Sequence, residues 1–157
     1  MTKPPPRGPG EKTKRPRDQL GRLLPWEADN LLELEDFDAL PLEECHRLGI
    51  AHWNAGRFFP AHEAWEAAWK KAKGTKDEEF FKGLSQLGAG YVHYGRGNPH
   101  GTKTLLRRGV SRVGRYITLH HGIDVESLAS VAENHAAAVE KAQRAGKRMP
   151  DITPPKV

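Results

Sequence analysis

The chain has 157 residues, of which 37% are hydrophobic and 29% charged, as expected for one globular domain with polar extensions. Its single cysteine, Cys45, excludes an intramolecular disulfide and is predicted to be buried and inert, and no apolar run approaches the roughly 18 residues of a membrane span. The formal net charge of +5 lies entirely within residues 1–25, where no apolar segment resembles a secretory signal. We therefore expect a cytoplasmic protein with no membrane partner.

The N-terminal part divides into two segments of different composition. Residues 1–22 are rich in proline, glycine, lysine and arginine, which predicts a disordered basic tail. Residues 23–40 mix leucines with acidic residues, and this acidic extension either forms a short helix against the body or stays solvated. A helical domain is predicted over residues 41–146, and a flexible polar tail over residues 147–157.

Apolar residues recur at helical spacing throughout the predicted domain, and proline, glycine and capping residues separate the helices. The expected helices span approximately residues 41–56, 60–74, 75–95, 99–119 and 124–146. No segment alternates between apolar and polar residues in the manner of a half-buried strand. The fold class is predicted to be all-α, a single compact bundle of about five helices in antiparallel hairpins.

The second predicted helix carries the most informative pattern, His62-Glu63-Ala64-Trp65-Glu66-Ala67-Ala68-Trp69. His62, Glu66 and Trp69 are spaced at i, i+4 and i+7 and therefore share one face of the helix. His62 lies in the first turn, where the positive end of the helix dipole favours a neutral imidazole with a free lone pair.

This His-x-x-x-Glu-x-x-Trp pattern resembles the signature of a bacterial and archaeal family called "domain of unknown function 309". The likeness covers roughly residues 45–115. The resemblance implies a helical fold and a proposed metal site at the signature, and it implies no established activity. The matching positions are Asn54, Gly56, Phe59, His62, Glu63, Trp65, Glu66, Trp69, Phe81, Gly83, Leu84, Gln86, Leu87, His93, Arg96, Gly97, Asn98 and Gly101.

Two ligands one helical turn apart make only half of a site for zinc, manganese or iron. Gln86 and His93 are the further candidate ligands, because they share a stripe of the third helix with Gly83 and Gly90, where the second helix would approach closely. If the protein is an enzyme, metal-assisted hydrolysis fits these groups best, with Glu63 as the candidate base although it points about 100° away from His62. The predicted pocket-lining residues are Asn54, Phe59, Trp65 and Trp69.

Other functions remain open. The protein could be a tetratricopeptide-like module of helical hairpins that binds a protein or peptide, in which His62 and Glu66 bond each other and are structural. A Gly-Arg-x-x-Pro pattern that recurs at residues 56–60 and 95–99 favours helical hairpins of this kind. A nucleic-acid accessory role would use the basic tail and one face of the fourth helix, which carries Arg108, Arg112 and Arg115. Assembly into a homo-oligomer is also open. The pair His120-His121 is expected at a solvated helix end.

Overall fold

The computed structural model describes residues 15–157, which fall into two compact units divided after Glu35. In the first unit, the carboxylate of Asp18 accepts hydrogen bonds from the backbone N–H groups of Leu20 (2.9 Å) and Arg22 (2.8 Å). The Arg22 guanidinium also pairs with this carboxylate at 2.7 Å, which closes a polar turn. Of the tail predicted to be disordered, residues 1–14 lie outside the described residues, and residues 15–22 include this turn.

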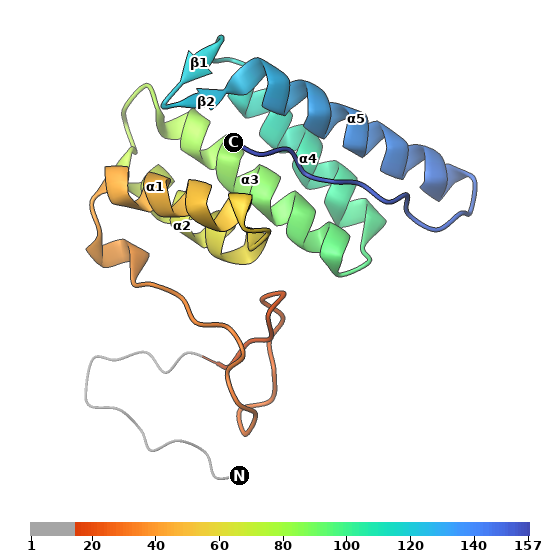
Figure 1. Ribbon diagram of the computed structural model, residues 1–157, viewed down its shortest axis with the longest axis horizontal. Coiled ribbons are helices and arrows are strands. Elements are labelled where there is room, and N and C mark those ends of the chain that lie inside the picture. Colours follow the sequence, from red (N-terminus) through yellow and green to blue (C-terminus); the bar gives the residue numbers. More distant parts are fainter. Residues whose placement is uncertain (1–14) are drawn as a thin grey trace. The chain divides into compact units, whose positions relative to one another are not determined.

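The second unit confirms the predicted all-α class of about five helices (Figure 1). Each long helix packs against the next one along the chain. A short 3-10 helix, η1, precedes them, and a two-stranded hairpin separates the last two. The bounds are η1 Phe37–Ala39, α1 Leu42–Asn54, α2 Phe58–Lys71, α3 Glu78–Gly95, α4 Pro99–Val113, β1 Leu119–His120, β2 Ile123–Asp124 and α5 Val125–Arg144.

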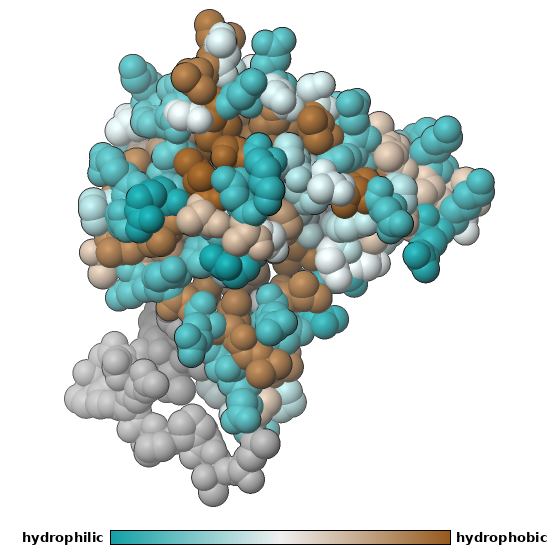
Figure 2. All heavy atoms as spheres, in the orientation of Figure 1, coloured by the Kyte–Doolittle hydropathy of each residue, from teal (hydrophilic) through white to brown (hydrophobic). Residues whose placement is uncertain are grey.

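The fourth helix is shorter than predicted, because it ends at Val113 and not near Leu119. Beyond it, β1 and β2 form an antiparallel hairpin in which His120 pairs with Ile123. Thr118 (φ 58°) and His121 (φ 48°) adopt left-handed backbone conformations that a right-handed helix cannot contain. The hydrophobic groups at the top of Figure 2 belong to this end of the bundle, where Ile117 and Leu119 are exposed.

Helix α3 lies between α2 and α4, and small residues allow close contact on both sides. A Cβ atom at Gly83 would lie 2.7 Å from Val113, and one at Gly90 would lie 2.7 Å from Leu106, so both glycines face α4. The expectation that this stripe faces α2 was therefore wrong. Gly88 is the glycine that faces α2, since a Cβ there would lie 3.2 Å from the backbone nitrogen of His62.

The last residues of the chain run back across the bundle from the end of α5 (Figure 1). Where the sequence predicts a flexible tail, the structure has a segment held by hydrogen bonds. Trp53 Nε1 donates to the carbonyl of Pro155 (2.6 Å), and the Tyr94 hydroxyl donates to the carbonyl of Pro150 (2.9 Å). Asn54 binds Val157 twice, donating to its carbonyl and accepting from its N–H, both at 2.9 Å.

Two other sequence-based points concern membranes and the cysteine. Among the described residues, no helix combines the length and apolar character needed to cross a membrane. Cys45 is fully buried, as predicted, and its thiol lies 3.2 Å from the carbonyl oxygen of Phe37. Burial raises the pKa of this thiol, which suits a core residue and not a reactive one.

Candidate functional site

The first candidate site lies near the N-terminal end of α2, where three side chains converge. His62 Nε2 lies 3.5 Å from Glu66 Oε2 and 3.8 Å from Glu63 Oε1. One nitrogen and two carboxylate oxygens of this group all lie within 4.8 Å of one another. The side chains are 24% (His62), 36% (Glu63) and 33% (Glu66) exposed, so solvent reaches them. We call these three residues the α2 cluster.

The orientation of the His62 ring is fixed by α3. Its Nδ1 lies 2.8 Å from the carbonyl oxygen of Ser85 and 2.9 Å from the Ser85 hydroxyl, which in turn donates to the His62 carbonyl at 3.1 Å. Because a carbonyl oxygen only accepts hydrogen bonds, Nδ1 carries the proton in the neutral ring. The lone pair is therefore on Nε2, which is the atom that faces Glu63 and Glu66.

The other predicted ligands lie outside the α2 cluster. Gln86 is on α3, and its side-chain carbonyl oxygen is buried and accepts no hydrogen bond. His93, near the C-terminal end of α3, contacts Asn98 Nδ2 through Nδ1 at 3.1 Å. Burial lowers the pKa of His93, and the nearby positive charge of Arg96 lowers it further. Glu63, in contrast, lies closer to His62 than the helical-wheel angle suggested.

The predicted pocket-lining residues have different surroundings. Trp65 is fully buried and donates from Nε1 to His46 Nδ1 at 3.0 Å. Phe59 packs beside His62, with the ring centroids 6.1 Å apart. Trp69 stacks under the ammonium group of Lys82, which lies 4.8 Å from its ring centroid, and Asn54 binds the C-terminal segment.

A surface hollow of about 580 Å³ lies away from the α2 cluster and is lined by α4 and α5. Its wall includes Arg107, Glu140 and Arg144, and Glu140 forms ion pairs with both arginines. The hydrogen bond from Arg107 is the largest influence on Glu140, and it lowers the pKa of that carboxyl. The charged side chains of the hollow therefore pair with one another, which indicates an ion-pair network and not a ligand site.

Of the three arginines predicted on one face of the fourth helix, Arg108 and Arg112 lie on α4, whereas Arg115 lies beyond its end at Val113. They are only partly available to an external anion. Arg112 Nε lies 3.3 Å from the Glu79 carboxylate, and Arg115 lies 3.5 Å from the same carboxylate. Arg108 is exposed on α4. Glu79 therefore neutralises part of the positive charge that the sequence places on this face.

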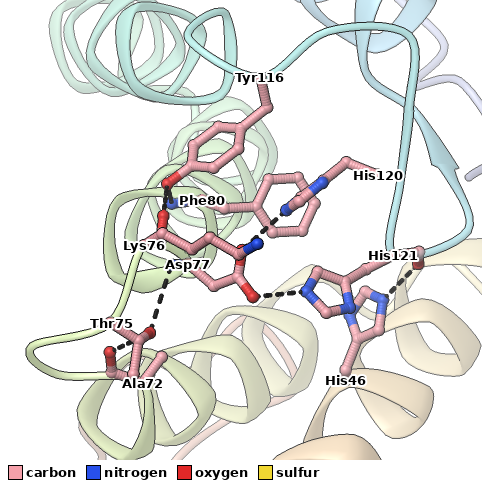
Figure 3. A network of polar contacts seen from close by, with 9 residues as sticks. All are labelled: His46, Ala72, Thr75, Lys76, Asp77, Phe80, Tyr116, His120 and His121. Atoms are coloured by element: carbon pink, nitrogen blue, oxygen red, sulfur yellow. Dashed lines mark hydrogen bonds and ion pairs between the residues drawn. The ribbon is translucent and has the colours of Figure 1, made fainter.

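A second group of potential ligands lies at the start of α3, beside the β1–β2 hairpin (Figure 3). Its members are Asp77, His120 and His121. Each imidazole Nε2 lies 2.8 Å from a different oxygen of Asp77. Burial alone would raise the pKa of Asp77, but the hydrogen bonds from His121 and His120 hold it below its ordinary value.

Sequence reasoning did not find this second group. It assigned His120 and His121 to a solvated helix end, because it extended the fourth helix to residue 119. Asp77 lies 43 positions before His120, so no local spacing connects them. The only local signal is the adjacency of two histidines before Gly122, and that signal does not indicate which carboxylate they meet.

The comparisons with known proteins agree with the resemblance inferred from the signature. No curated protein and no solved structure matches the chain. A family model does match, over residues 46–105, a stretch that runs from α1 into α4 and contains the α2 cluster. Over these residues the chain resembles the uncharacterised helical family described as "Domain of unknown function (DUF309)".

Proposed function

We propose that the protein binds a divalent transition metal ion at the α2 cluster, with His62 and Glu66 as ligands and Glu63 as the third. One observation carries the proposal. The bond from Nδ1 to the Ser85 carbonyl leaves a nitrogen lone pair and two carboxylates directed at one point. These three groups repel one another unless a cation, either a proton on Nε2 or a metal ion, lies among them.

The distances and the donor types fit a metal ion. Ligand atoms of a tetrahedral zinc site lie about 3.4 Å apart, which follows from bond lengths of about 2.1 Å. The separations of 3.5 and 3.8 Å within the α2 cluster are close to this value and longer than hydrogen bonds. One imidazole and two carboxylates suit zinc, manganese or iron, and exposure to solvent leaves a position for water.

Lys70 is the main competitor within the chain, because its ammonium nitrogen lies 3.6 Å from Glu66 Oε1. The side chain of Lys70 is 63% exposed, so this ion pair is weak and a metal ion would displace it. When bound, a metal ion would supply Lewis acidity for hydrolysis. Glu63 would then bind the ion, so it would not serve as the general base, and that role would have no assigned residue.

Elemental analysis tests the proposal. The protein is purified without a histidine tag or chelator, incubated with zinc, manganese or iron, and desalted. We expect the double variant His62→Ala, Glu66→Ala to contain about one metal ion per chain fewer than the wild type, because the α2 cluster holds that ion. His100→Ala, which removes an exposed histidine of α4, is the matched control and should keep that ion. Equal metal content in the double variant and the control would overturn the proposal.

A second candidate function, a peptide-binding module, is favoured by the way the chain holds its own C-terminal segment. Trp53 and Asn54 bind that segment through its backbone carbonyl and N–H groups, a mode that suits extended or proline-rich peptides of many sequences. Binding of a labelled peptide with the sequence of residues 150–157 would support this function if Asn54→Ala weakened it. A nucleic-acid role would instead show steeply salt-dependent binding.

A further inference from the structure

Asp77, His120 and His121, which we call the hairpin cluster, come from two parts of the chain (Figure 3). Asp77 is the N-cap residue of α3, a position where an aspartate usually accepts a hydrogen bond from the first turn of its own helix. Its side chain makes no such capping bond here. Both carboxylate oxygens instead face imidazole nitrogens of the hairpin, 2.8 Å away.

Two consecutive histidines reach the same carboxylate only because the backbone bends between them. Successive side chains of an extended strand point to opposite faces, so His120 and His121 would normally diverge. His121 adopts φ 48°, a backbone conformation that is uncommon for residues other than glycine, and Gly122 follows with φ 79°. This backbone conformation brings both imidazoles to the same side of the hairpin.

The surrounding side chains hold the two rings in place. His46 Nε2 donates to the carbonyl of His121 at 2.8 Å, which fixes the backbone of the turn. The ring centroid of Phe80 lies 4.7 Å from that of His120, and the ring centroid of Phe81 lies 5.3 Å from that of His121. These contacts restrict the orientation of both imidazoles, and the hydrophobic shell around a metal site controls the access of solvent to it.

We propose that the hairpin cluster is a second metal site, which binds Zn²⁺ or a similar transition metal ion through two imidazole nitrogens and one carboxylate oxygen. Two histidines and one carboxylate are a frequent ligand set for zinc and iron. The three ligand atoms lie within 4.8 Å of one another, and the side chains are 27% (His120), 35% (His121) and 21% (Asp77) exposed. Solvent can therefore deliver the ion and complete its coordination.

Metal binding requires only a small rearrangement. The nitrogen–oxygen distances of 2.8 Å are hydrogen-bond distances, each to a different oxygen of Asp77, and the distance to the ligating oxygen widens by about 0.6 Å to reach about 3.4 Å in a tetrahedral site. Each neutral imidazole transfers its proton from Nε2 to Nδ1 through solvent, and Nε2 then donates its lone pair to the metal. No proton is released from neutral rings, and the ion replaces the two hydrogen bonds to Asp77.

The hairpin cluster is independent of the α2 cluster, because the two share no residue. His120 and His121 also lie beyond residues 46–105, which match the family model. The double variant His62→Ala, Glu66→Ala provides a background in which only the hairpin cluster offers such a ligand set among the described residues. A failure of this proposal is therefore distinguishable from a failure of the proposed function.

Zn²⁺ titration by calorimetry, in that double-variant background, tests the hairpin cluster. We expect one Zn²⁺ per chain, and at least a tenfold loss of affinity on adding Asp77→Asn. The amide keeps the size of the side chain and one oxygen acceptor for an imidazole, so the hairpin should stay docked while the charged ligand is lost. The matched control is Glu126→Gln, an exposed carboxylate-to-amide change in the first turn of α5, which should leave the affinity unchanged.

Bound Co²⁺ gives a second measurement, since its visible absorption reports the coordinating groups. We expect the spectrum to change in His120→Ala and in His121→Ala, each compared with the Glu126→Gln control. Absence of Zn²⁺ binding in the double-variant background would overturn the proposal. Equal Zn²⁺ affinity in the Asp77→Asn variant and its control would also overturn it, and the cluster would then be a structural hydrogen-bond pin.

Discussion

Replacing Gly49 with alanine should destabilise the protein, although alanine is the better helix former. Gly49 lies within α1, under the indole of Trp65. A Cβ atom at this position would lie 2.6 Å from Cε2 and 2.7 Å from Nε1 of that ring. Because Trp65 is fully buried, its ring has little room to move away, and a shift would break its hydrogen bond to His46.

The expected change in the free energy of unfolding follows from two destabilising contributions and one stabilising contribution. Overpacking of a core costs about 1–3 kcal/mol, and an unsatisfied buried hydrogen-bonding group costs about 1–3 kcal/mol. The higher helix propensity of alanine offsets about 1 kcal/mol of this loss. We therefore expect Gly49→Ala to lower the free energy of unfolding by about 1–5 kcal/mol.

Urea denaturation followed by tryptophan fluorescence measures this change as a shift in midpoint at constant m-value. Ala51→Gly, at an exposed position of the same helix, isolates the propensity contribution and should cost about 1 kcal/mol. A Gly49→Ala variant as stable as the wild type, or more stable, would refute the reasoning. It would mean that the Trp65 indole moves aside at little cost.

Two further predictions concern pH and the C-terminal segment. Burial lowers the pKa of His135, which lies 2.8 Å from the Tyr91 hydroxyl, so its contribution to stability is complete above about pH 6.5 and is lost as the pH falls through the lowered pKa. The thermal unfolding midpoint should therefore decrease when the pH is lowered from about 7.5 to about 5.5, and it should decrease less in His135→Gln. An equal decrease in the variant and the wild type would contradict this. Asn54→Ala removes both hydrogen bonds to Val157, so the Val157 amide should exchange with deuterium faster than in the wild type, and unchanged exchange would show that other contacts hold the segment.

Most of the fold was predictable, because helix periodicity and end signals are local. The last two helices were predicted to start at residues 99 and 124, and in the structure the side chains of Asn98 and Asp124 accept hydrogen bonds from the backbone N–H groups of Gly101 (3.1 Å) and Ser127 (3.0 Å). The hairpin after α4 was not predictable from these signals. Two of its left-handed residues, Thr118 and His121, are not glycine, and tertiary contacts hold them there.

The candidate sites show the same limit. His62 and Glu66 were identified because their four-residue spacing places them on one face of α2. The bond from His62 to Ser85 was missed, since it depends on how α2 lies against α3. The stripe of α3 that contains Gly83 was predicted to face α2, but Gly83 faces α4, because the helical phase alone does not identify the neighbouring helix.

Helix α2 supports both candidate sites from different faces. His62 and Glu66 lie on the face that reaches solvent, whereas Trp65 points into the core and donates to His46. A buried indole N–H needs such a partner. Because His46 accepts from Trp65 at Nδ1, it carries its proton on Nε2 and donates to the carbonyl of His121. Trp65, a core residue at one of the unspecified positions of the signature, thus supports the turn that carries His120 and His121, two residues outside the family match.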